Sequence, residues 1–138
     1  MYDNNSKIVA IIDETLPVGL ALNAMAVIGV SMGRLVEGLV GDDVPCQDGV
    51  TFPGVIKIPL PLLKADAARL SELFQVVTGD DRFMSFPFSK LAQSCRSYDE
   101  YISRMSAAPS ATLALSGLGF IGPKAEVVSL TGSLPLYR

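Results

Sequence analysis

The sequence contains no histidine and no tryptophan, and only 18% of its 138 residues are charged. Without histidine, every Ser-His-Asp or Cys-His catalytic arrangement is excluded, as is every zinc site that uses a histidine ligand. The two cysteines, Cys46 and Cys95, form no CxxC pair, so we expect two free, buried or half-buried thiols rather than a zinc or thioredoxin-like motif. The sequence therefore predicts no metal site and no bound cofactor.

Positive charge is scarce as well. The chain has 11 Lys and Arg residues against 14 Asp and Glu residues, which gives a net charge of −3. A protein that binds nucleic-acid phosphates usually carries a basic excess, so we expect no nucleic-acid partner. The first residues include Asp3, Asp13 and Glu14 and lack the basic start of a signal peptide, which favours a cytoplasmic location.

Hydrophobic residues, by contrast, make up 49% of the sequence. This length and composition fit a single α/β domain over residues 1–138. The longest uncharged run, residues 15–33, is long enough for a transmembrane helix, but it contains Pro17, Asn23, Ser31 and three glycines and has no aromatic belt. We interpret it as a buried crossover helix and expect no membrane contact.

Hydrophobic periodicity and turn residues predict an alternation of strands and helices. Strands are expected at residues 7–12, 55–60, 83–88, 112–121 and 126–130, helices at 17–40, 63–77 and 98–106, and a loop over 42–54. The third helix begins with a capping box, Ser97-x-x-Glu100. With right-handed crossovers, this order gives a three-layer α/β domain with a mixed, mostly parallel sheet and helices on both faces.

Residues Gly117 to Gly122 match G-x-G-x-x-G, the spacing of a dinucleotide-binding loop. That loop must open a helix, and here Pro123 and the β-branched run EVVSL follow it. We therefore interpret the glycines as part of a strand that lies beneath a close neighbour.

Two adjacent acids, Asp13 and Glu14, lie where the first strand should end and the first helix begin. Open α/β sheets usually bind ligands at this place, and two carboxylates there can serve as base, acid or metal ligands. The alternative is a structural role, because acids before a helix interact favourably with its N-terminal dipole.

Asn23, Lys57 and Ser89 are the candidate ligand-binding residues. Asn23 is polar within an apolar helix and Lys57 lies between isoleucines, so each either faces a pocket or is an ordinary structural or edge residue. Ser89 begins a polar cluster that includes Lys90 and Arg96, which are further candidates for catalysis.

The opening and the ending of the chain together resemble a known family. Residues 7–12 (KIVAII), followed by Leu16-x-x-Gly19 and a helix of small residues, resemble the start of type II peptidyl-tRNA hydrolases. Gly122-Pro123 and then Val127-Val128-x-Leu130-Thr131-Gly132-x-Leu134 resemble their last strand and its Thr-Gly-x-Leu tail. Residues 7–33, 93–101 and 117–136 resemble more closely the domain of unknown function 2000 family, and this resemblance implies the hydrolase fold.

The departures from the hydrolases concern their chemistry. Their first helix carries a lysine after the glycine and a histidine seven positions later, where this sequence has Leu20 and Val27, or Gly19 and Ala26 in a register shifted by one. Their Asp-Ala-Gly-x-Thr segment has no counterpart in residues 84–90. The resemblance therefore implies no catalytic residue, and we expect no peptidyl-tRNA cleavage.

Two functions are consistent with these observations. The first is binding of a small-molecule ligand or a protein partner at the carboxyl ends of the strands. The alternative is a diverged hydrolase, with Asp13 or Glu14 as base and Lys90 or Arg96 stabilising developing negative charge.

The first helix also predicts an assembly. Between Pro17 and Met32 its only polar residues are Asn23 and Ser31, so nearly its whole circumference should be covered. A second subunit is the natural cover, and we expect a homodimer or a higher symmetric oligomer in which Gly29 and Gly33 make close contact with the sheet or across the interface. The alternative is that this helix is buried entirely within its own chain.

Overall fold

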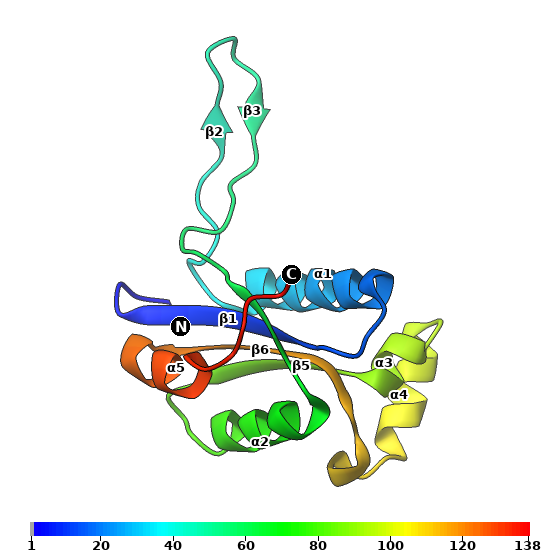
Figure 1. Cartoon of the computed structure of the whole chain (residues 1–138). Helices are drawn as coiled ribbons and strands as arrows, with labels where there is room; N and C mark the ends of the chain where they lie inside the picture. Colours follow the sequence, from blue (N-terminus) through cyan, green and yellow to red (C-terminus); the bar gives the residue numbers. More distant parts are fainter. Residues whose placement is uncertain (1) are drawn as a thin grey trace.

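The structure, a computed structural model that describes residues 2–138, is built on a four-stranded sheet in the order β4-β1-β6-β5 (Figure 1). The strands are β1 (Ser6–Asp13), β4 (Leu62–Ala65), β5 (Met84–Ser89) and β6 (Leu115–Pro123). Only β1 and β4 pair in parallel, while β6 lies antiparallel between β1 and β5. The predicted mixed sheet is confirmed, but its mostly parallel character is wrong because β6 occupies the centre.

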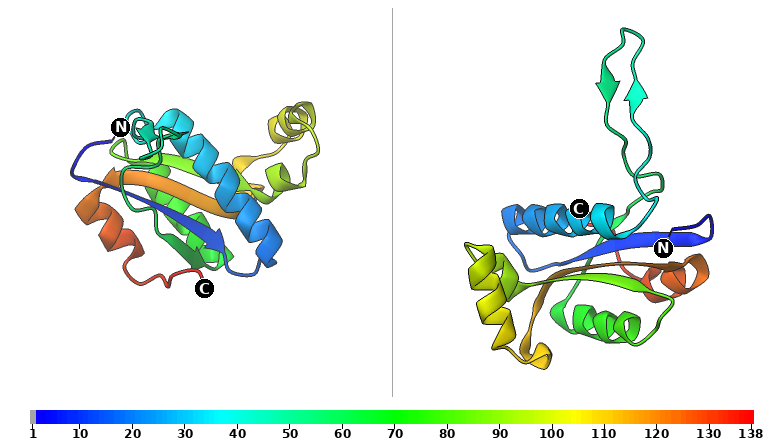
Figure 2. Two further views of the ribbon diagram at one scale, coloured as in Figure 1. Left: turned by 90° about the horizontal axis from the view of Figure 1, so that it is seen from above. Right: turned by 180° about the vertical axis from the view of Figure 1, so that it is seen from behind.

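Helices cover both faces of the sheet (Figure 2). On one face, α1 (Val18–Leu35) packs on Ile8, Ala10 and Ile12 of β1. On the other, α2 (Ala67–Thr78) and α5 (Lys124–Thr131) pack on Val9 and Ile11. The run KIVAII is thus apolar without alternation because both of its faces are buried, as predicted.

The second predicted strand lies in the wrong place. Residues 55–60 form a connection with one isolated bridge, and the strand β4 follows the two prolines at 59 and 61. The N–H groups that proline lacks are needed in a sheet ladder, which explains why pairing begins only at Leu62. The next helix accordingly starts at Ala67, later than the apolar repeat from residue 63 suggests.

The ending of the chain is also corrected. Residues 126–130, expected as a strand, lie in α5, which buries Val127 and Thr131 one helical turn apart. This packing outweighs the strand preference of the β-branched run. A helix therefore does follow the glycine motif, yet its glycines lie within β6: a Cβ at Gly119 would lie 2.4 Å from Met32 Cε of α1. The motif brings α1 close to the sheet, as predicted.

Two smaller helices follow β5. The five-residue α3 (Lys90–Ser94) continues directly from the strand, and α4 (Tyr98–Ser106) confirms the third predicted helix. The cap that Ser97 provides is present, since Ser97 Oγ accepts from Glu100 N at 3.1 Å, while Glu100 Oε2 accepts from the N–H of Arg96, one residue before the N-cap, at 2.8 Å. A short 3₁₀ helix at Ser110–Thr112 leads into β6.

The region expected as a loop forms an arm that projects from the body (Figure 1). Helix α1 ends at Leu35, earlier than the expected residue 40, and the chain then forms a hairpin of β2 (Val44–Pro45) and β3 (Thr51–Phe52). By length and composition alone, α1 is the one helix of the described residues that passes a test for a membrane span. Its inner stripe nevertheless packs on the sheet of the same chain.

Candidate functional site

The carboxyl ends of two strands and the start of a third lie together at one end of the sheet. Since β1 and β5 are both antiparallel to β6, their carboxyl ends lie beside the start of β6. This arrangement brings together Asp13, the last residue of β1, Ser89, the last of β5, and Ser116 near the start of β6. The sequence-predicted location of the site, at the carboxyl ends of strands, therefore gathers polar side chains.

Asp13 and Lys90 form an ion pair at this end of the sheet. Lys90 Nζ lies 2.6 Å from Asp13 Oδ2, while Thr15 donates to Oδ1 through its backbone N–H at 2.9 Å and its hydroxyl at 2.8 Å. The Asp13 side chain is only 1% exposed and that of Lys90 is 42% exposed. Burial acts to raise the pKa of Asp13, but the hydrogen bonds from Lys90 and Thr15 and the charge of Lys90 outweigh it and lower the pKa below its ordinary value. Asp13 is therefore a carboxylate near neutral pH and a weak base.

A second polar network fixes α3 against α1. Gln93 Nε2 donates to Leu20 O at 2.8 Å and to Asn23 Oδ1 at 3.2 Å, and Ser116 Oγ donates to Gln93 Oε1 at 2.7 Å. Asn23 is thus an exposed acceptor in a structural network, the alternative that the sequence left open. The network joins α1, α3 and β6 and so holds one wall of the neighbouring pocket.

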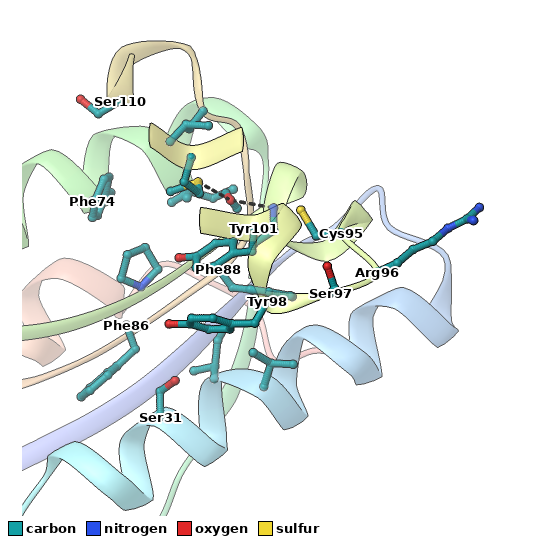
Figure 3. A pocket seen from close by; sticks show the side chains of 18 residues that line it. Ser31, Phe74, Phe86, Phe88, Cys95, Arg96, Ser97, Tyr98, Tyr101 and Ser110 are labelled. Carbon is teal, nitrogen blue, oxygen red and sulfur yellow. Dashed lines mark hydrogen bonds between the residues drawn. The ribbon is translucent and has the colours of Figure 1, made fainter. Parts of the chain in front are cut away.

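An apolar pocket of about 650 Å³ lies between β5, α1 and α4. Its lining is mainly aromatic: Figure 3 shows Tyr98 and Tyr101 of α4 extending toward the space beside Phe86 and Phe88 of β5. None of the residues of α4 is buried, although the helix carries an apolar stripe. The stripe is therefore available to a bound molecule.

Hydroxyl groups mark the polar points of this pocket. Ser31 of α1 and Ser97, the N-cap of α4, line the pocket (Figure 3), and Ser89 lines it from the end of β5. Ser89 Oγ accepts from Ala92 N at 3.0 Å and lies 3.8 Å from Met105 Sδ, so it caps α3 while lining the cavity. The prediction of Ser89 as a ligand-binding residue stays open, and its position at the pocket favours it.

The remaining candidates lie apart from this pair and this pocket. Glu14 is exposed beside Asp13 and, within residues 2–138, forms no ion pair. Arg96 lines the rim but its side chain points outward (Figure 3). Lys57 is exposed at the base of the arm, where its N–H donates to Leu39 O at 2.9 Å, and it belongs to no strand of the sheet.

Sequence reasoning missed the aromatic residues of the pocket. The run FMSFPF and the stripe of α4 both read as core, since apolar residues at strand or helix spacing are usually buried. The signal that distinguishes them is geometric: β5 is an edge strand, and α4 stands beside that edge rather than over a face of the sheet.

Within residues 2–138 no three Cys, Asp or Glu side chains gather as metal ligands would. Cys46 on the arm and Cys95 at the pocket are both free thiols, and Cys95 is half-buried as expected, but Cys46 is exposed because nothing else within residues 2–138 packs against the arm. The serines at the pocket have no histidine base in this chain, so nucleophilic catalysis of the Ser-His type has no basis in the site.

Comparisons with known proteins add a family and a fold. A family model described as "Protein of unknown function (DUF2000)" matches residues 6–138. A solved structure, the protein of unknown function Atu0240 from Agrobacterium tumefaciens, is similar over 100% of both chains with a TM-score of 0.87 at 16% identity, a likeness that shows the fold. No curated protein matches this chain.

Proposed function

Because the chain belongs to the DUF2000 family, whose description assigns no activity, we propose from the geometry that it binds a small, largely apolar ligand with an aromatic part in the pocket between β5, α1 and α4. The observation that carries this proposal is the pocket itself, about 650 Å³ and lined by Phe86, Phe88, Tyr98 and Tyr101. Binding sites for small molecules have volumes of about 300–1,000 Å³ and combine apolar walls with a few polar groups.

The chemistry of the lining defines the ligand class. Aromatic walls favour a ring that stacks on or meets them edge-on, an arrangement worth about 0.5–1.5 kcal/mol per pair beyond burial. Apart from Arg96 at the rim, whose side chain points outward, the polar side chains of the lining include the hydroxyls of four serines and two tyrosines (Ser31, Ser89, Ser97, Ser110, Tyr98 and Tyr101). The ligand is therefore neutral or weakly polar, with one or two groups that accept or donate hydrogen bonds.

A pair of variants tests this site. Ser31→Phe places a ring in the pocket, while Ser129→Phe places the same ring on the exposed surface of α5. The probes are the neutral fluorophore N-phenyl-1-naphthylamine and a thermal-shift panel of neutral aromatic compounds that includes indole, because a ligand of the native state raises its apparent stability.

We expect Ser31→Phe to weaken probe binding at least tenfold and Ser129→Phe to leave it unchanged. Equal binding by both variants, or no shift in melting temperature with any compound, would overturn the proposal.

The Asp13–Lys90 pair favours a second candidate, a diverged hydrolase. The two groups converge at 2.6 Å at the strand ends, and the partly exposed Lys90 can stabilise negative charge that develops on a substrate. Asp13 would then position Lys90 rather than act as a strong base, because its own oxygens already accept from Lys90 and Thr15.

Loss of a measured hydrolysis in Lys90→Met, but not in Lys124→Met on the exposed start of α5, would support this candidate. Equal rates would reject it. Leu20 and Val27 replace the lysine and histidine of peptidyl-tRNA hydrolases, so peptidyl-tRNA should remain uncleaved.

Two further points belong to the proposal. A fold relation to type II peptidyl-tRNA hydrolases is supported by the opening of the sequence, which resembles theirs, whereas the residues that resemble their last strand form α5. A cytoplasmic location is supported by the two free thiols, since reduced cysteines are usual there.

A further inference from the structure

The outer face of α1 is apolar and uncovered. Its inner stripe, Ala21, Ala24, Ile28 and Met32, is buried against the sheet, and these four are its only buried residues. Val18, Leu22 and Val30 on the outside are 64%, 59% and 75% exposed. Arg34 is the only charged residue of the helix. Contiguous apolar surface of this kind usually marks an interface.

The glycines of α1 also lack a purpose within the chain. A Cβ built at Gly19 or Gly29 meets no heavy atom within 4 Å, and one at Gly33 meets only Val40 at ordinary contact distance. The sheet therefore does not require these glycines, although each lowers helix stability by about 1 kcal/mol relative to alanine. They leave room for a backbone that comes from outside the chain.

The arm, residues 42–53, presents a second apolar surface on the same side of the molecule (Figures 1 and 2). All twelve of its residues are exposed, including Val44, Val50 and Phe52. A two-stranded hairpin with nothing packed against it is marginally stable in water. The arm therefore needs a surface to lie on.

The base of the arm is held firmly, which fixes the direction in which it projects. Gly41 N donates to Val55 O at 2.9 Å and Lys57 N to Leu39 O at 2.9 Å. The two sides of the base approach so closely that a Cβ on Gly54 would lie 1.7 Å from Gly41 O. Glycine at 54 is required by this contact, so the arm is a built feature and not a loose loop.

We propose that a second copy of this chain covers both surfaces in a two-fold dimer, with the α1 helices antiparallel and each arm lying on the partner subunit. An antiparallel pair places the C-terminal end of one α1 beside the N-terminal end of the other. The arm begins just after the C-terminal end of α1, so its Val44 and Phe52 lie beside the exposed Val18 and Leu22 side chains of the other copy.

The size and charge of the surface favour this occupant. Twelve exposed arm residues and ten exposed α1 residues supply the roughly 20–30 per subunit of a stable interface. In a two-fold contact every charge on the axis meets its own copy, and α1 has no charge before Arg34. A lipid bilayer fits less well, because the arm carries Asp42, Asp43 and Asp48 and no basic residue, and anionic membrane surfaces repel it.

Molar mass measured by light scattering during gel filtration tests the dimer. The wild-type chain is expected at twice 14.6 kDa at micromolar concentration. Val30→Asp, which changes an exposed α1 residue, should elute at 14.6 kDa with an unchanged circular dichroism spectrum. The matched control Val76→Asp, on the outer side of α2, should remain a dimer.

Phe52→Asp tests the arm separately and should raise the dimer dissociation constant at least tenfold, whereas Gln47→Asp on the same arm should change it less than threefold. A wild-type mass of 14.6 kDa, or a Val30→Asp dimer as tight as wild type, overturns the proposal. Co-sedimentation of a monomeric wild type with phosphatidylcholine vesicles would assign the surface to lipid instead. Ligand binding in the pocket is measured independently, so either proposal can fail alone.

Discussion

The two strand–helix units of this molecule begin alike and end differently. Strands β1 and β4 are parallel neighbours, with Asp13 opposite Ala65, and each is completed by an aspartate before its helix. Asp66 caps α2 by accepting from Arg69 N at 2.8 Å, while Asp13 instead binds Lys90 and Thr15. Helix α1 then begins after Pro17 without a side-chain cap.

The outer faces of α1 and α2 also differ, in how apolar they are. Helix α2 buries one stripe and turns an Arg69–Glu72 ion pair to solvent, with Val76 as its one large exposed apolar side chain. Helix α1 buries one stripe and turns valines and leucines outward. Helix α2 therefore packs within one chain, whereas α1 leaves an apolar outer side exposed, the surface that we propose a second subunit covers.

The largest expected effect separates the two helices by one identical substitution. Leu73→Ala in α2 removes a fully buried side chain and should cost about 2–5 kcal/mol of unfolding free energy through lost burial and a cavity. Leu22→Ala in α1 changes an exposed side chain and should cost less than about 0.5 kcal/mol in the monomer. Urea unfolding at submicromolar concentration measures the free energy of unfolding of both variants. Equal losses would contradict the conclusion that Leu22 is exposed in the monomer while Leu73 is buried.

The inner side of α1 should tolerate no added bulk. Gly119→Ala places a Cβ 2.8 Å from Ile28 Cγ2 as well as against Met32, and the branched isoleucine cannot move away easily. Overpacking of this kind costs about 1–3 kcal/mol. The same unfolding measurement applies, and a stability equal to wild type would show that α1 does not lie so close to β6.

Asp13 and Lys90 predict a pH dependence of stability. The pKa of Asp13 is lowered in the folded state, so its contribution is complete above the ordinary carboxyl value of about 3.9 and is lost as the pH falls through the lowered value. Asp13→Asn should cost about 1–2 kcal/mol at pH 7, a figure reduced because Lys90 is partly exposed. Urea unfolding from pH 7 to pH 2 should show that this difference is constant down to about pH 5 and shrinks below about pH 4. A difference that persists to pH 2 would contradict the assignment.

The cap on α2 should contribute a smaller amount. Asp66→Ala removes the acceptor for Arg69 N and should cost about 1 kcal/mol, while Asp66→Asn retains an acceptor and should cost much less. Thermal unfolding of the two variants distinguishes the cap from the negative charge. Equal losses would assign the effect to charge.

Local patterns predicted much of this fold because local forces decide those parts. The structure confirms three such local predictions: the buried strand at KIVAII, the helix that buries the apolar stripe of α2, and the N-cap that Ser97 provides for α4. The predicted strand at residues 126–130 was wrong. Val127 and Val128 favour a strand locally, but these residues form a helix in which Val127 packs on the sheet. The prediction of a mostly parallel sheet was wrong because no local signal places the antiparallel strand β6 between β1 and β5.

The candidate site divides in the same way. The sequence predicts that Asp13 lies at the end of a strand. It also names Lys90 as a candidate residue that acts together with Asp13. Their contact depends on the position of β6 and on α3 continuing directly from β5, which only the fold defines. The pocket is non-local as well, because Ser31 and Tyr98 meet only once α1 and α4 are placed.

The smallest expected effect concerns the outer side of α1 and has the opposite sign. Gly29→Ala adds a Cβ that meets nothing within 4 Å and replaces a poor helix former, so the monomer should gain about 0.5–1 kcal/mol. Urea unfolding at submicromolar concentration measures this gain. At high concentration the gain should shrink or reverse, because in a dimer the added methyl group separates the two helices. A gain that is the same at every concentration would leave Gly29 outside the interface, and a loss at low concentration would mean that its own chain requires the glycine.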